Sequence, residues 1–180
     1  MRSAFPALAA LALLPLAASL SACGDTFGGI DPLIRTDSFT LAAPTGPSGR
    51  PSAVDVASNV LLTHPERPAE AGVFDIQVRQ NGSTFSLVPS APVGNLRGAG
   101  LQKTTRSIDA PGKAPREVAG YTRTAVTIAA GETYFIQTRP VCSTTSKYGI
   151  FKVIEVKPDS GTVTLKLVSN QNCDDERLEP

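Results

Sequence analysis

The C-terminal part of this 180-residue chain follows a period of two, and this pattern constrains its fold more than any other feature. Apolar and polar residues alternate in "TYFIQTR" (133–139), "KYGIFKVIEVK" (147–157) and "TVTLKLVS" (162–169). Such alternation places successive side chains on opposite faces of a β-strand. The last two segments are separated only by a Pro-Asp-Ser-Gly turn at 158–161. The pattern predicts an antiparallel meander with one face in a core and the other in water.

Earlier segments show the same period. "VFDIQVR" (73–79) and "TFSLV" (84–88) flank Asn81-Gly82, a dipeptide typical of tight β-hairpins. Further strands are expected at 38–42 and 121–128, and the connections are rich in Gly and Pro. Together these features predict an all-β fold, an antiparallel β-sandwich with long loops.

One segment leaves an alternative open. Residues 53–64, "AVDVASNVLLTH", could form a short helix, although they are rich in β-branched residues and are followed by a proline. We treat helix there as the secondary possibility.

The N-terminal 22 residues have the composition of a secretory signal peptide. Arg2 is the only charge before Asp25, and an Ala- and Leu-rich run leads to small residues. A membrane-spanning anchor needs about 20 apolar residues, and this run is interrupted by Pro6 and Pro15. A soluble secretory signal is the other alternative, but it does not account for Cys23.

The segment Leu20-Ser21-Ala22-Cys23 resembles the signal of bacterial lipoproteins. The resemblance implies that the Cys23 thiol receives a diacylglycerol group, that the chain is cut before it, and that the new amine is acylated, for example with palmitate. Two or more acyl chains anchor a protein stably, whereas one does so only reversibly. Gly24, in place of Asp, implies the outer membrane, with periplasmic and surface-facing orientations both open.

This resemblance divides the chain into three parts: a signal peptide (1–22), a flexible tether (23–37) and a single β-sandwich domain (38–180). Loss of Arg2 with the signal reduces 17 basic residues to 16, which equals the 16 acidic residues. A formal charge of zero gives no general attraction to nucleic acid, so we expect no nucleic-acid partner.

With Cys23 acylated, Cys142 and Cys173 remain as an even pair in an exported, oxidising setting. Each follows a strand of the expected meander, and these two strands end at the same edge. We therefore expect a disulfide between them; two free thiols are the alternative. A closed loop of this length stabilises a fold by about 3.5 kcal/mol.

Residues suited to catalysis or metal binding are few. His64 is the only histidine, and no nucleophile motif accompanies it. Zinc needs three or four ligands, mostly His or Cys. The acidic stretch 170–176 lacks the spacing of a calcium loop and is expected to be a solvated tail. We expect no catalytic residue, no metal site and no cofactor.

The meander also resembles, over about 40 residues, the end of the haem-carrier β lipoproteins of the HmuY-like group. It shares a strand ending in Arg139, a Lys-containing strand at 147–157 and a glycine hairpin before 162–169. The resemblance implies a carrier architecture. Those carriers bind haem iron through two histidines, and only His64 is present here, so haem binding is not implied.

We therefore expect a membrane-anchored envelope lipoprotein that is not an enzyme but a binding or structural module. Its partners would be the membrane, through the lipid anchor, and an envelope protein or a small ligand. Loops 89–120 and 139–147 are the candidate binding surface. A small-ligand carrier is one alternative, and a hydrolase that uses carboxylates is another.

Overall fold

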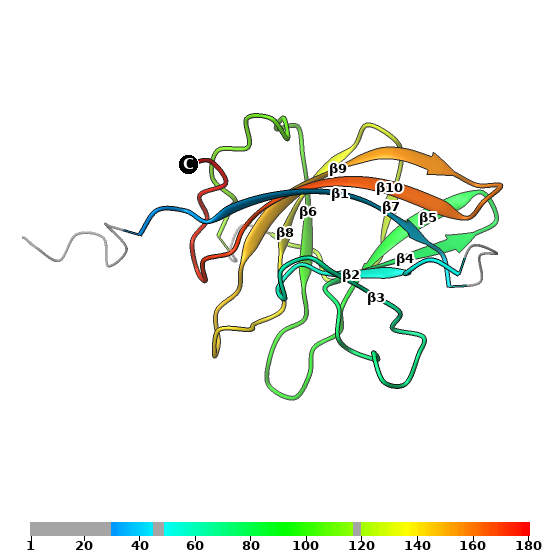
Figure 1. The fold of residues 1–180 in the computed structure, drawn as a ribbon, viewed down its shortest axis with the longest axis horizontal. Coiled ribbons are helices and arrows are strands. Elements are labelled where there is room, and N and C mark those ends of the chain that lie inside the picture. Colours follow the sequence, from blue (N-terminus) through cyan, green and yellow to red (C-terminus); the bar gives the residue numbers. More distant parts are fainter. Residues whose placement is uncertain (1–29, 45–48, 117–119) are drawn as a thin grey trace, which may run out of the picture. The chain divides into compact units, whose positions relative to one another are not determined.

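The computed structural model describes residues 30–44, 49–116 and 120–180. Within these residues the chain forms ten strands in two five-stranded antiparallel sheets packed together, which confirms the predicted sandwich (Figure 1). The first sheet has the order β1 (Ile34–Ala42), β10 (Thr162–Asn170), β9 (Tyr148–Lys157), β8 (Thr133–Gln137) and β6 (Gly100–Thr104). The second has the order β3 (Leu61–Thr63), β2 (Ala53–Asp55), β4 (Ile76–Asn81), β5 (Thr84–Pro89) and β7 (Val126–Ile128).

Both predicted hairpins are present. Asn81 of β4 pairs with Thr84 of β5, and the intervening Gly82 has a φ of 59°, a conformation that glycine adopts without strain. Lys157 of β9 pairs with Thr162 of β10 across the 158–161 turn. The predicted meander therefore forms the β8–β9–β10 part of the first sheet.

The structure excludes one alternative and corrects two expected boundaries. Residues 53–64 form β2, a turn and β3 rather than a helix, because Val54 pairs with Leu62 on one side and with Ile76 on the other. Strand β1 begins at Ile34, so residues 34–37 belong to the sheet and not to the tether. Loop 89–120 is interrupted by β6, which pairs with β8.

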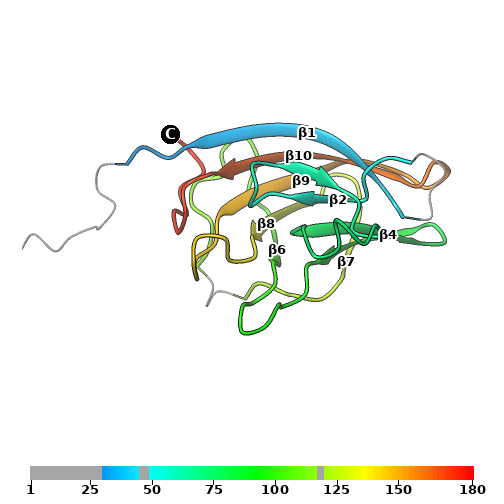
Figure 2. The same ribbon diagram turned by 60° about the horizontal axis from the view of Figure 1, so that its bottom comes forward.

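The two sheets lie over one another (Figure 2). Alternate residues of their strands form the main core between them. The first sheet contributes Leu41, Leu101, Tyr134, Ile136, Phe151, Val153, Val163, Leu165 and Leu167. The second contributes Val54, Ile76, Val78, Phe85, Leu87 and Ile128. The rings of Tyr134 and Phe151 stack with centroids 5.4 Å apart.

The outer face of the first sheet is only partly in water, contrary to expectation. A second cluster, which includes Phe135, Ile150 and Val168 of the sheet, is covered by Ile108 and Leu178. The acidic C-terminal tail is thus folded rather than solvated: Leu178 is 1% exposed, and its amide donates to the carbonyl of Gly112. Apolar burial on both faces explains why every residue of β8 is buried.

No helix among the described residues is long and apolar enough to cross a membrane. The expected signal peptide and Cys23 lie outside the described residues.

Candidate functional site

One end of the sandwich brings together the predicted binding loop 139–147 and the first part, 90–99, of the other predicted binding loop. In the first sheet, Gln137 ends β8, Tyr148 begins β9 and Asn170 ends β10, and these residues pair side by side. In the second sheet, Asp55 ends β2 and Ile76 begins β4. We call this the loop end. It is formed by segments 56–60, 90–99, 138–147 and 171–176, whereas the β4–β5 and β9–β10 hairpins form the opposite end (Figure 1).

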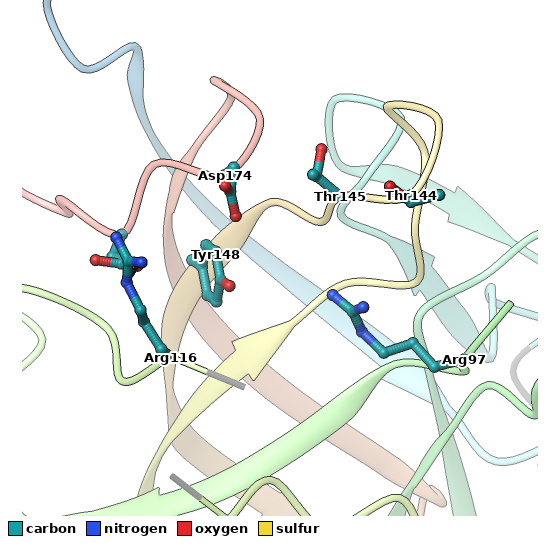
Figure 3. Close-up of a pocket in the computed structure, with 7 residues that line it drawn as sticks. Arg97, Arg116, Thr144, Thr145, Tyr148 and Asp174 are labelled. Carbon is teal, nitrogen blue, oxygen red and sulfur yellow. Dashed lines mark ion pairs between the residues drawn. The ribbon is translucent and has the colours of Figure 1, made fainter. Parts of the chain in front are cut away.

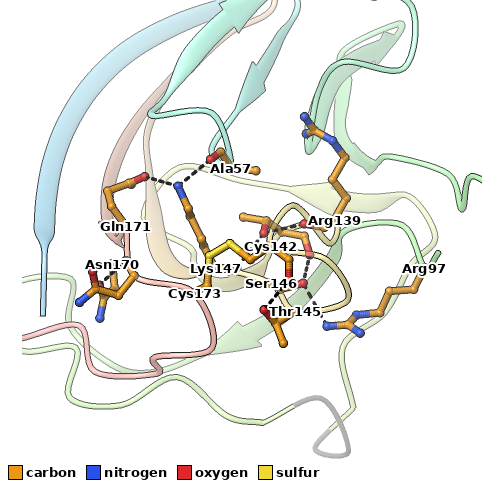
Figure 4. The surroundings of a disulfide bond; sticks show 12 residues. Ala57, Arg97, Arg139, Cys142, Thr145, Ser146, Lys147, Asn170, Gln171 and Cys173 are labelled. Atoms are coloured by element: carbon orange, nitrogen blue, oxygen red, sulfur yellow. Dashed lines mark hydrogen bonds between the residues drawn. A yellow bond between two sulfur atoms is a disulfide. The ribbon is translucent and has the colours of Figure 1, made fainter. Parts of the chain in front are cut away.

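The expected disulfide between Cys142 and Cys173 is present at the loop end (Figure 4). The Cα atoms are 6.2 Å apart, within the usual range for a disulfide. The bond joins the β8–β9 loop to the segment after β10, across the start of β9. Two loops from non-adjacent strands are thereby held together.

A buried ionic cluster, consisting of Arg139, Asp55 and Asp75, joins the two sheets at this end. Arg139 Nη1 and Nη2 donate to the two carboxylate oxygens of Asp55 at 2.9 and 2.8 Å. Its backbone N–H donates to Asp75 Oδ1 at 2.8 Å, and Nη1 lies 3.3 Å from the same oxygen. Both carboxylates are fully buried, and the Arg139 side chain is 18% exposed.

The cluster also fixes the turn between β2 and β3. The amide of Ala57 donates to Asp75 Oδ2 at 2.8 Å, and the amide of Ser58 donates to Asp55 Oδ1 at 3.0 Å. Val60, in the same turn, has a φ of 60°, which is unusual for a β-branched residue. The hydrogen bonds to the two aspartates therefore hold a turn that is locally unfavourable.

The two aspartates have opposite pKa shifts. Burial raises the pKa of Asp75 from 3.8 to about 6, and the attraction of Arg139 only partly offsets this. Burial also disfavours the charged form of Asp55, but the hydrogen bonds from Arg139 and Ser58 outweigh it and lower the pKa. Arg139 is thus shared unequally, with Asp55 as its bidentate partner.

Lys147 forms a second connection across the loop end (Figure 4). Its Nζ donates to the carbonyl of Ala57 at 2.8 Å and to Gln171 Oε1 at 3.1 Å, so it links the β2–β3 turn to the segment after β10. Burial lowers the pKa of Lys147, although Asp55 and Asp75 act in the opposite direction. The loop end is therefore held by a disulfide, by the partly buried Arg139 and by the buried Lys147, whose acceptors lie on distant segments.

A cleft of about 290 Å³ opens beside the disulfide (Figure 3). It is lined by Arg97, Arg116, Thr144, Thr145, Tyr148, Asp174 and Glu176. Arg116 pairs with Glu176, and Arg97 Nη2 donates to Ser146 Oγ at 3.0 Å. Figure 3 shows Tyr148 between the two arginines. The cleft offers hydroxyl groups and charges of both signs but no predominant charge.

The other residues considered in the sequence lie elsewhere. His64 Nδ1 is 3.0 Å from Glu66 Oε1, and the backbone N–H of His64 donates to Glu70. Asp175, within the acidic stretch 170–176, binds Arg177, and hydrogen bonds from this arginine lower the pKa of Asp175 to about 2. Among the described residues, no three His, Cys, Asp or Glu side chains are grouped so that they could hold a metal ion.

Sequence reasoning missed the ionic cluster. The alternation in 73–79 assigns Asp75 to a polar face, yet the residue is fully buried. Arg139 and Asp55 are separated by 84 residues and belong to different sheets. The only local sign of the cluster is that Asp55 directly follows the apolar residues Ala53 and Val54. This is weak evidence that the charge of Asp55 is buried.

Comparison of the chain with protein-family models, with curated proteins and with solved structures finds no match. The arrangement of residues must therefore indicate the function by itself. Both buried carboxylates accept hydrogen bonds from Arg139 and from backbone N–H groups, which suits a structural role. The disulfide, Arg139 and Lys147 together produce a set of loops with one defined conformation.

Proposed function

We propose that this protein is an envelope lipoprotein, anchored in the outer membrane through a lipid on Cys23, whose sandwich domain is a non-enzymatic binding module. The motif Leu20-Ser21-Ala22-Cys23 supports the anchor. The loop end supports the binding role, since loops of a β-sandwich commonly carry its recognition surface.

The observation that carries the proposal is the cross-linking of the loop end. The Cys142–Cys173 disulfide, the Arg139–Asp55 ion pair and the Lys147 hydrogen bonds connect three segments that are distant in sequence. Loops that are already ordered lose little conformational entropy on binding, so a given contact area yields more affinity.

The anchor is tested by replacing Cys23 with Ser in the full chain expressed in a Gram-negative cell. We expect the wild-type chain to incorporate labelled palmitate and to sediment with membranes, because acylation at Cys23 supplies its hydrophobic anchor. The Cys23→Ser variant should take up no label and should leave the membrane fraction.

The matched control is Ser19→Ala, which changes a small residue of the same segment but keeps the four-residue motif. It should be labelled like the wild type. Palmitate on the Cys23→Ser variant, or none on the wild type, would refute the proposed anchor.

A further inference from the structure

Exposed aliphatic side chains are concentrated at the loop end. Seven large aliphatic residues between Asp31 and Pro180 are exposed within the described part of the chain, and Ile154 alone lies toward the hairpin end. The other six are Leu33, Leu61, Val73, Val93, Leu96 and Val141. Val93 is 66% and Leu33 61% exposed. Exposed apolar side chains that share one end of a domain are candidates for contact with a partner.

Contacts within the loop end bring three of these segments together. Backbone hydrogen bonds of 3.0 Å between Val93 and Leu96 close a tight turn in the β5–β6 loop. Arg97, next in the chain, binds Ser146 of the β8–β9 loop, which also carries Val141. Cys142 then links that loop to the segment after β10. We call Val93, Leu96 and Val141 the aliphatic rim.

The chain enters the domain beside this rim. The Gln171 amide donates to the carbonyl of Leu33 at 2.9 Å, and Asn172 Nδ2 donates to the carbonyl of Asp31 at 2.9 Å. Cys23 precedes Asp31 by eight residues, which can span at most about 28 Å. If Cys23 carries the lipid, the domain is attached to its anchor at the loop end.

We infer that the aliphatic rim docks on the surface of the bilayer that holds the anchor. This inference rests on the proposed function and names the partner of the loop end. Charge does not favour an anionic surface, since Arg97 and Arg116 at the cleft are matched by Asp174 and Glu176. The partner is therefore a zwitterionic phospholipid surface, contacted through Val93, Leu96 and Val141 at the level of the headgroups.

The short tether makes a weak contact sufficient. Three aliphatic side chains bind a membrane only weakly by themselves, but an anchor within about 28 Å makes the second contact intramolecular. Docking in this way would orient the domain with the β4–β5 and β9–β10 hairpins directed away from the bilayer.

Tryptophan fluorescence tests the orientation cleanly, because the chain contains no Trp. The full-length variants Val93→Trp and Ile154→Trp are each purified from membranes and reconstituted in phosphatidylethanolamine–phosphatidylcholine vesicles with brominated acyl chains. Both sites carry exposed aliphatic residues, so Ile154→Trp is the matched control. Val93→Trp should lose about half of its emission, since an interfacial residue lies about 5–10 Å into the headgroup boundary. Ile154→Trp should lose almost none.

Two further measurements sharpen the test. Val141→Trp, on the neighbouring loop, should be quenched like Val93→Trp. Leu96→Asp in the Val93→Trp background should reduce the quenching, whereas added salt should leave it unchanged because the contact is apolar.

The outcomes separate this inference from the proposed function. If the protein carries its lipid but Val93→Trp and Val141→Trp are quenched no more than Ile154→Trp, the docking is wrong. The proposed anchor is then unaffected. A wild-type chain without lipid overturns both proposals.

Discussion

The two ends of the sandwich are stabilised by contacts that differ in the sequence separation of their residues. At the hairpin end, β4 and β5 are joined by two residues. An exposed hydrogen bond from Gln80 Nε2 to the carbonyl of Pro158 connects the two hairpins. At the loop end, the Arg139–Asp55 pair spans 84 residues and the disulfide spans 31. Local turns need little support from the rest of the fold, whereas loops of non-adjacent strands acquire one conformation only through long-range contacts.

The largest expected effect comes from removing the central cation of the loop end. Arg139→Met should lower the free energy of unfolding by about 3–5 kcal/mol, because Asp55 and Asp75 would remain buried without their cation. Urea denaturation followed by circular dichroism measures the change. Arg79→Met, at an exposed position of β4, is the control and should change stability little. Equal effects of the two substitutions would show that the ionic cluster contributes nothing specific.

Removing the disulfide should have the next largest effect. The Cys142→Ala/Cys173→Ala variant should lose about 3.5 kcal/mol, and its Tm should fall by about 10 °C, because the unfolded chain regains the entropy of a loop of 31 residues. Thermal unfolding with and without reductant provides the measurement. The reductant should affect the wild type only, and a free thiol at either position in the denatured, unreduced wild type would contradict the pairing.

Asp75 should give the loop end a pH dependence. Its folded pKa of about 6 exceeds the unfolded value of 3.8, so protonation stabilises the folded chain. This contribution is complete below about pH 4 and is lost as the pH rises through about 6. Relative to Asp75→Asn, the wild type should therefore be more stable at pH 4 than at pH 7.

Unfolding free energies of both proteins across this range measure the effect. Asp159→Asn, at the exposed β9–β10 turn, provides the comparison at the hairpin end. A constant difference between wild type and Asp75→Asn would mean that Asp75 does not titrate in this window.

The smallest expected effect lies at the hairpin end. Gly82→Ala should cost about 1 kcal/mol, since alanine at a φ of 59° is strained while no atom lies within 4 Å of the added Cβ. Ser83→Ala, at the neighbouring position, should be nearly neutral. Denaturation midpoints compare the two, and a cost for Gly82→Ala as large as that for Arg139→Met would remove the contrast between the ends.

The sequence predictions were accurate where the contacts are local, at the hairpin end, and less accurate where the contacts are long-range, at the loop end. The β4–β5 and β9–β10 hairpins were predictable because Gly82 and the 158–161 turn act on their immediate neighbours. Strands β2 and β3 were not, since each has three residues and depends on pairing with partners brought together by the fold. The disulfide was predictable from the order of the strands and from the even pair of cysteines that remains if Cys23 is acylated. The ionic cluster was not, because a charged residue carries no local sign that it will be buried.

The sequence by itself determined the strand-rich class and the two tight hairpins, because alternation and turn residues act on their immediate neighbours. It also favoured the pairing of Cys142 with Cys173, through the number of cysteines left if Cys23 is acylated. Only the tertiary structure decided that Asp55, Asp75 and Arg139 meet, and that the C-terminal tail covers the first sheet. Those features depend on which distant segments share a face of the fold. Burial in that setting, rather than residue type, determines whether a charge is a solvated surface group or a cross-link between sheets.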